Sequence, residues 1–145
     1  MTATDDDPLA PAVAVLDAQP FNALVGARVT AFRNGTAELV LDVEERHRQQ
    51  YGVVHGGVMA YLADNVLTFA AGSAVGPDVI TGGVSVDYLR AVRTGRLRAV
   101  ASVAHRSRRH AVVTGEIWHE PGDGEPRLCA IAHGTVFVTA PKATS

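Results

Sequence analysis

Residues 55–68, with the sequence HGGVMAYLADNVLT, predict a helix that is apolar on almost every side. A helix with such a surface is normally buried on most of its faces. Its polar-capable residues follow the spacing i, i+3, i+4 and i+7, which puts them in one stripe along the helix. These residues are Tyr61, Asp64, Asn65 and Thr68. A carboxylate in the middle of such a helix therefore needs an explanation.

Two explanations fit the stripe. In the first, the stripe is the solvated edge of an amphipathic helix, and Asp64 is an ordinary surface acid. In the second, Asp64 has a chemical role, which suits a stripe that is short and contains no Lys, Arg or Glu. The pattern alone leaves both explanations open.

The start of the helix adds a second feature, because Gly56 and Gly57 follow His55 directly. The first turn of a helix has unpaired backbone N–H groups with partial positive charge. Glycine lets a ligand approach such a backbone closely, so this end can hold an anion or a developing oxyanion. A simple tight turn would also explain the two glycines.

Together, the helix start and the carboxylate suggest acyl transfer. Asp64 lies eight residues beyond Gly56, which corresponds to about 12 Å along one helix axis. The two groups of one chain cannot both reach the same carbonyl group. Two antiparallel helices in a two-fold dimer can bring Gly56 of one chain to Asp64 of the other. We therefore expect an active site shared between two subunits.

The remaining sequence predicts an antiparallel sheet. Apolar and polar residues alternate on both sides of Asn34-Gly35, a dipeptide typical of type I′ hairpin turns. Consecutive strands with short turns favour antiparallel pairing, and one helix on one sheet is an α+β architecture. The helix is predicted over 56–74, and the strands are predicted over 27–33, 36–43, 79–91, 96–106, 110–119 and 127–139.

The composition is that of one ordinary globular domain, with 145 residues, 47% hydrophobic residues and a net charge of −2. This charge gives no sign of a nucleic-acid partner. The one cysteine, Cys129, lies in an apolar run, which predicts a buried thiol without a disulfide. We find no signal-peptide pattern and no membrane-length run of uncharged apolar residues, so we predict a cytoplasmic protein without a membrane span. The domain is predicted over 13–140, between flexible segments at 1–12 and 141–145.

The order of these features resembles the hotdog-fold acyl-CoA thioesterases of the phenylacetate-pathway (PaaI-like) type. It is also similar to the acyl-CoA thioesterase 13 and 4-hydroxybenzoyl-CoA thioesterase branches, which use a helix carboxylate. The resemblance runs from Phe21 to Val138 and rests on the NG hairpin, GVVHGG, MAYLADN, GGVSVDYLR and GTVFV. It implies an antiparallel sheet of five to six strands wrapped around one long helix. It also implies homodimers with shared sites that commonly pair into homotetramers.

The resemblance implies a role for each matching residue. The Gly56 N–H would polarise the thioester carbonyl, and Asp64 would be the nucleophile or the general base. Three residues would orient the thioester, the carboxylate or the water: Gln49 (with Gln50 as its neighbouring alternative), Thr68 and Ser85. Four more would line the substrate site, with His55 mainly ordering the turn: His55, Gly57, Tyr61 and Asn65.

Coenzyme A carries a 3′-phosphate and a diphosphate, so arginines near the site are expected to bind it. Such residues are Arg90, Arg106, Arg108 and Arg109, although turns are often charged simply because they are wet. We expect no metal and no cofactor, because coenzyme A is part of the acyl-CoA substrate. The acyl group stays open between aryl-acetyl, hydroxyaryl and medium-chain groups.

Two alternative functions differ in the residues that they need. A non-catalytic acyl-CoA-binding or regulatory module would keep the fold and the arginines but would need no carboxylate at Asp64. A hotdog hydratase would need a His/Asp pair for water addition, and the sequence shows no such motif. The chain also lacks a G-x-S-x-G elbow, a P-loop and a dinucleotide-binding fingerprint.

Overall fold

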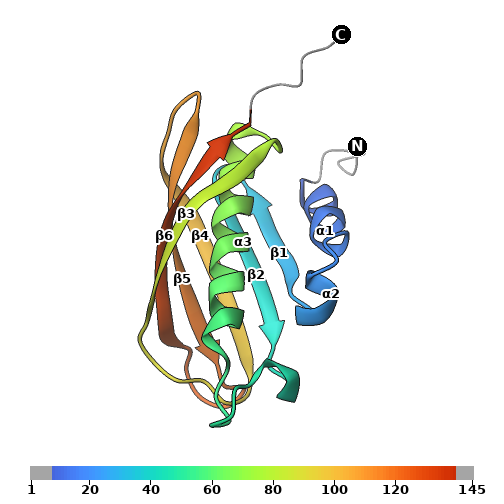
Figure 1. Cartoon of the computed structure of the whole chain (residues 1–145), viewed down its shortest axis with the longest axis vertical. Coiled ribbons are helices and arrows are strands. Elements are labelled where there is room, and N and C mark those ends of the chain that lie inside the picture. Colours follow the sequence, from blue (N-terminus) through green and yellow to red (C-terminus); the bar gives the residue numbers. More distant parts are fainter. Residues whose placement is uncertain (1–7, 140–145) are drawn as a thin grey trace.

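Helix α3, Gly56–Val75, runs along the concave face of a six-stranded antiparallel sheet (Figure 1). The computed structural model describes residues 8–139. The strands follow the spatial order β1-β2-β4-β5-β6-β3. Their bounds are β1 Arg28–Arg33, β2 Thr36–Asp42, β3 Val79–Tyr88, β4 Arg96–Arg106, β5 His110–Glu120 and β6 Arg127–Val138. The predicted α+β hotdog architecture is confirmed, and the predicted central helix agrees with α3 to within one residue.

The hairpin between β1 and β2 forms at the predicted dipeptide. Asn34 has a φ of 50° and Gly35 a φ of 83°, the backbone that a type I′ turn requires. The Gly35 N–H also donates to Ser73 Oγ at 2.8 Å. The hairpin is therefore tied to the C-terminal half of α3.

Strand β3 departs from the predicted pairing of successive strands. It pairs with β6 at the far edge of the sheet, while β4 pairs with β2. The segment between β3 and β4 is therefore a crossing connection and not a tight turn. Both Leu89 and Arg90 donate their N–H groups to the Cys129 carbonyl, so regular pairing ends at Tyr88, earlier than predicted. Within residues 8–139, the outer edge of β3 pairs with no strand.

The core lies between α3 and the sheet, and α3 contacts all six strands. Leu67 is fully buried over two glycines of neighbouring strands. A Cβ at Gly115 would lie 3.2 Å from the Leu67 side chain, and one at Gly134 would lie 3.3 Å from it. The close approach of helix and sheet thus depends on these glycines. With 20 residues and a mean hydropathy of 1.3, α3 has the length and composition of a membrane span, but core helices pass the same test.

Two short helices precede the sheet, and the first lies beside β1 (Figure 1). They are α1, Leu9–Asp17, and α2, Asn22–Val25; a 3₁₀ turn, Glu45–His47, follows β2. Helix α1 includes the last residues of the segment predicted as flexible, 1–12, and Ala12 is buried. The predicted flexible residues 1–7 and 141–145 lie outside the described residues.

Candidate active site

Asp64 is exposed in the single chain, and its carboxylate is held by two threonines. Thr81 Oγ1 donates to Asp64 Oδ1 at 2.7 Å, and Thr68 Oγ1 lies 2.8 Å from Thr81 Oγ1. Thr68 also donates to the Asp64 backbone carbonyl at 2.8 Å. The second carboxylate oxygen, Oδ2, has no hydrogen-bond partner in the part of the chain that is described. The carboxylate is therefore oriented through one oxygen, and the other is free to accept a hydrogen bond.

Thr81 contacts the candidate site but is not among the residues predicted from the sequence, and a β-bulge explains why. The pairing of β3 with β6 shifts register between Thr81 and Gly83. Simple alternation would put Thr81 and Ser85 on one face, but the bulge turns Thr81 toward α3 and Ser85 away from it. Ser85 is exposed and pairs with His133, while its neighbours Val84 and Val86 pack against the core. Within one chain, Ser85 therefore does not reach Asp64.

The bulge has its own signal in the sequence, the pair Gly82-Gly83. A Cβ at Gly82 would lie 2.1 Å from the Phe137 ring, so any other residue there would displace that ring. Glycine inside a strand pattern often marks a bulge, and this one could have located Thr81.

The Gly56 end of α3 forms a second, separate group. His55 is the N-cap, and its Nδ1 accepts the Gly57 N–H at 2.8 Å. A Cβ at Gly57 would come within 2.9 Å of this nitrogen, so the cap needs glycine. The Tyr88 hydroxyl donates to the Gly56 carbonyl at 2.9 Å. Across residues 8–139, the Gly56 N–H itself has no acceptor and remains an available donor.

Gln49 belongs to the connector before His55. The side-chain oxygen of Gln49 accepts a hydrogen bond from the Tyr51 N–H, and the backbone N–H of Gln49 donates to the Val53 carbonyl at 2.8 Å. Gln49 is half-buried, whereas Gln50 is exposed. Within one chain, Gln49 therefore shapes the loop at the Gly56 end, and it is not hydrogen-bonded to Asp64.

The other two stripe residues, Tyr61 and Asn65, hold the N-terminal segment. The Tyr61 hydroxyl donates to Asn22 Oδ1 at 2.8 Å, and Gln19 Nε2 donates to Asn65 Oδ1 at 3.3 Å. Phe21 packs edge-on against Tyr61, with ring centroids 5.2 Å apart. Burial raises the pKa of Tyr61, which keeps its hydroxyl a donor. The stripe thus divides into a pair that anchors the N-terminal segment, Tyr61 and Asn65, and a pair at the candidate site, Asp64 and Thr68.

The predicted arginines lie at opposite ends of α3. Arg90 lies two residues after Tyr88, whose hydroxyl contacts the Gly56 carbonyl, so Arg90 is near the Gly56 end of α3. Arg106 donates to the Ala74 carbonyl at the other end, and Arg108 and Arg109 are exposed in the same β4–β5 turn. These two groups of arginines do not meet within one chain.

An open hollow of about 550 Å³ lies beside Asp64, lined in part by Gly57, Ala60 and Thr81. Cys129 offers no competing nucleophile, because burial raises the pKa of its thiol to about 11. Among the described residues, no group of three or more His, Cys, Asp or Glu side chains is arranged to hold a metal ion.

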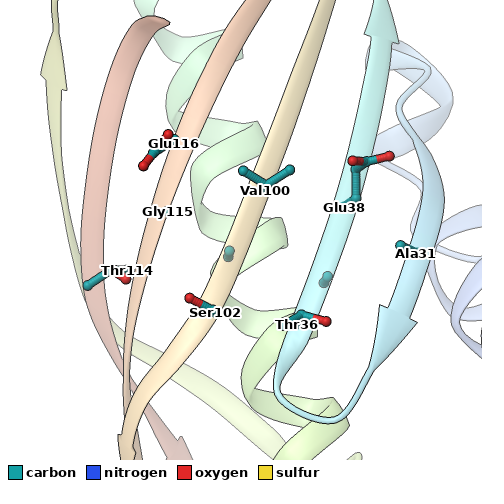
Figure 2. A pocket seen from close by; sticks show the side chains of 10 residues that line it. Ala31, Thr36, Glu38, Val100, Ser102, Thr114, Gly115 and Glu116 are labelled. Atoms are coloured by element: carbon teal, nitrogen blue, oxygen red, sulfur yellow. The ribbon is translucent and has the colours of Figure 1, made fainter.

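Figure 2 shows a different hollow, of about 410 Å³, on the sheet face that points away from α3. Its carboxylates include Glu38, which is bound to Thr30 Oγ1 at 2.7 Å and to Arg98 at 3.5 Å. The start of α3 at Gly56 lies on the other side of the sheet, so this surface lacks the donor that the Gly56 N–H supplies. Among the described residues, the candidate groups for acyl transfer therefore lie on the α3 side.

Comparison with known proteins identifies the family. Residues 51–125 match the family described as Thioesterase superfamily. A 1,4-dihydroxy-2-naphthoyl-CoA hydrolase of Escherichia coli (strain K12) is 30% identical over 105 residues, covering 71% of this chain and 74% of that protein. A mutant of the phenylacetic acid degradation protein PaaI from Thermus thermophilus has 30% identity and a TM-score of 0.74, covering 83% of this chain and 100% of that chain. A thioesterase family protein from Silicibacter pomeroyi has 27% identity and a TM-score of 0.79, covering 89% of this chain and 93% of that chain. The predicted resemblance is confirmed: the chain belongs to the thioesterase superfamily of hotdog-fold proteins and is a thioester hydrolase of the acyl-CoA type.

Proposed function

We propose that this enzyme hydrolyses acyl-CoA thioesters at a site made by Asp64 of one subunit and the Gly56 N–H of the partner subunit. One observation carries the proposal: a threonine-held carboxylate with a free oxygen and an unpaired helix-start N–H lie on the same helix. They are about 12 Å apart by helix rise. Each is half of an acyl-transfer site, and neither is complete alone.

In the proposed reaction, the partner's Gly56 N–H donates to the thioester carbonyl oxygen. Asp64 then either removes a proton from water, which attacks the carbonyl carbon, or attacks that carbon itself. Negative charge develops on the oxygen and is stabilised by the N–H and the positive end of the helix dipole. The C–S bond breaks, and the thiolate of coenzyme A leaves and takes up a proton. Water hydrolyses the anhydride if Asp64 was the nucleophile.

The edge strand β3 supports the dimer that this reaction needs. Its outer edge is unpaired within residues 8–139, and it carries Ile80, 60% exposed, and Tyr88, 53% exposed. Exposed apolar residues on an unpaired edge favour pairing with another strand. A second copy joined through β3 would place the two α3 helices antiparallel around a two-fold axis. The homotetramer remains a prediction from the family resemblance.

The dimer also gives the arginines a role. The partner's Arg90 would accompany the partner's Gly56 into the site that contains Asp64. The β4–β5 turn lies near the other end of α3, in the same subunit as Asp64, and carries Arg106, Arg108 and Arg109. Guanidinium groups suit phosphate oxygens, so these residues are proposed to bind coenzyme A.

A mixed dimer tests the shared site directly. Gly56→Pro removes the N–H but suits the first helical position, and His55, with a ψ of 135°, already has the backbone that precedes proline. Each homodimer of Gly56→Pro or Asp64→Asn should be nearly inactive. A purified heterodimer of the two variants should recover about half of the wild-type activity, because one of its two sites is intact. An inactive heterodimer would show that each site belongs to one chain.

A further inference from the structure

Beyond Thr68, the catalytic face of α3 becomes apolar and borders a second hollow. This hollow, of about 410 Å³, lies between α1 and the C-terminal half of α3, and we refer to it as the α1 pocket. Its lining includes Val15 of α1, Phe32 of β1, Phe69 and Gly72 of α3, and Val79 of β3. We infer that the α1 pocket holds the acyl group of the substrate and selects unsubstituted apolar acyl groups. This inference rests on the proposed function.

The α1 pocket adjoins the hollow beside Asp64. Both are lined by Gln19, Asn65 and Thr68. On β3, Val79 lines the α1 pocket and Thr81 lines the hollow at Asp64. These two residues are two apart on one strand face, which places them about 7 Å from each other. An acyl chain whose carbonyl lies at Asp64 would therefore enter the pocket past Thr68, between the Thr68–Thr81 contact on one side and the Gln19–Asn65 hydrogen bond on the other.

The lining determines the chemical class of the acyl group. Phe32 and Phe69 pack edge to face with ring centroids 6.1 Å apart, and they offer an apolar wall. Ser73 supplies a hydroxyl at the deep end, but it already donates to the Ala70 carbonyl and accepts the Gly35 N–H, both at 2.8 Å. A hydroxyl group on the buried end of a substrate would lack a ready partner there. The pocket therefore favours a plain aryl or alkyl group over a hydroxyaryl group.

The length of the path sets the size of the acyl group. Gly72 lies eight residues beyond Asp64 on α3, which is about 12 Å along the axis. An extended chain advances about 1.25 Å per carbon, so roughly nine to ten carbons span the whole path. Octanoyl-CoA and phenylacetyl-CoA are shorter than this upper limit and represent the class.

Gly72 is the position at which the pocket can be blocked. A Cβ there would lie 3.9 Å from Val79 Cγ2, an ordinary contact, so Gly72→Ala fits and Gly72→Leu fills the pocket. The matched control is Ala14→Leu, which adds the same side chain to an exposed position of α1 that does not line the pocket. We expect Gly72→Leu to lower kcat/KM for octanoyl-CoA at least tenfold and for acetyl-CoA less than twofold. Gly72→Ala should cause a smaller loss of kcat/KM with the same selectivity for octanoyl-CoA over acetyl-CoA. Ala14→Leu should change kcat/KM for neither substrate.

Equal losses for both substrates, or no loss in a folded Gly72→Leu protein, would overturn the inference. Wild type should also prefer phenylacetyl-CoA to 4-hydroxyphenylacetyl-CoA at least fivefold, and the reverse order would count against the apolar pocket. Calorimetry in an Asp64→Asn background separates the pocket from catalysis. In this background, adding Gly72→Leu should weaken the binding of octanoyl-CoA at least tenfold and leave the Kd of acetyl-CoA unchanged. A Kd that does not depend on the length of the acyl group would refute the role of the α1 pocket. Absence of turnover in the wild-type enzyme would instead refute the proposed function.

Discussion

The two half-sites of α3 are built in different ways. The Gly56 half-site is local: His55, Gly56 and Gly57 are consecutive, and the cap joins the first to the third. The Asp64 half-site is assembled over distance, because its carboxylate depends on Thr81, which lies 17 residues away on another element. A local turn is set by its own residue types, whereas the carboxylate site depends on strand register. Mutations should therefore affect the two half-sites through different means.

Asp64→Asn should have the largest effect, because it removes the base or nucleophile and keeps the side chain's size. We expect kcat to fall about a thousandfold, the scale of general acid–base catalysis, with an unchanged Tm. Asp123→Asn is the matched control, since Asp123 is exposed in the connection between β5 and β6, and its activity should stay within twofold of wild type. A similar loss in both variants would remove the special role of Asp64.

A single turnover in ¹⁸O-water divides the two roles of Asp64. If the carboxylate activates water, the label appears in the acid product. If the carboxylate attacks and water then cleaves the anhydride at the aspartyl carbon, the label appears in Asp64. Mass spectrometry of the product and of the peptide that contains Asp64 makes the distinction.

Gly56→Pro should come next, because it removes one oxyanion donor while the helix keeps a favourable first residue. We expect kcat to fall about a hundredfold, as for other single oxyanion-hole donors. Gly56→Ala keeps the N–H and is the control, although its Cβ would lie 3.4 Å from the Tyr88 ring. Its loss should stay below fivefold. Equal losses for proline and alanine would mean that crowding, and not the donor, limits the rate.

Thr81→Val should have a smaller effect, because it removes the 2.7 Å hydrogen bond to Asp64 Oδ1 and preserves the shape of the side chain. Losing an exposed bond to a charged group costs on the order of 1.4 kcal/mol, so kcat should fall about tenfold. Thr81→Ser retains the hydroxyl and should recover most of the activity. A Thr81→Ser variant as slow as Thr81→Val would place the importance of Thr81 in packing.

The sequence predicted the local parts of this molecule well. The Asn34-Gly35 turn, the central helix and the capped Gly56 turn follow from residue types within a few positions of each other. The pairing of β3 with β6 was not predicted, because it depends on a connection between distant segments. The bulge at Gly82 then puts Thr81 and Ser85 on opposite faces of β3, although simple alternation would put them on the same face.

The anchoring role of Tyr61 and Asn65 also depends on distant residues. Periodicity placed both in the polar stripe, but it could not show that Asn22 and Gln19 would bind them. The N-terminal segment has weak periodicity around Pro20, so its position on α3 comes from tertiary contacts.

His55→Ala should have the smallest effect, on stability, because it removes the N-cap acceptor of the Gly57 N–H. Loss of a cap costs about 1 kcal/mol in the free energy of unfolding, which urea denaturation can measure. Gly57→Ala should cost a similar amount, since its Cβ would come within 2.9 Å of His55 Nδ1 and displace the cap.

The double variant tells whether both changes act through that one hydrogen bond. If they do, His55→Ala combined with Gly57→Ala should cost no more than His55→Ala alone, because the crowded nitrogen is already gone. Alanine's higher helix propensity would even return part of the loss. Additive costs would instead mean that Gly57 is needed for a separate reason, such as close approach of the substrate to the helix start.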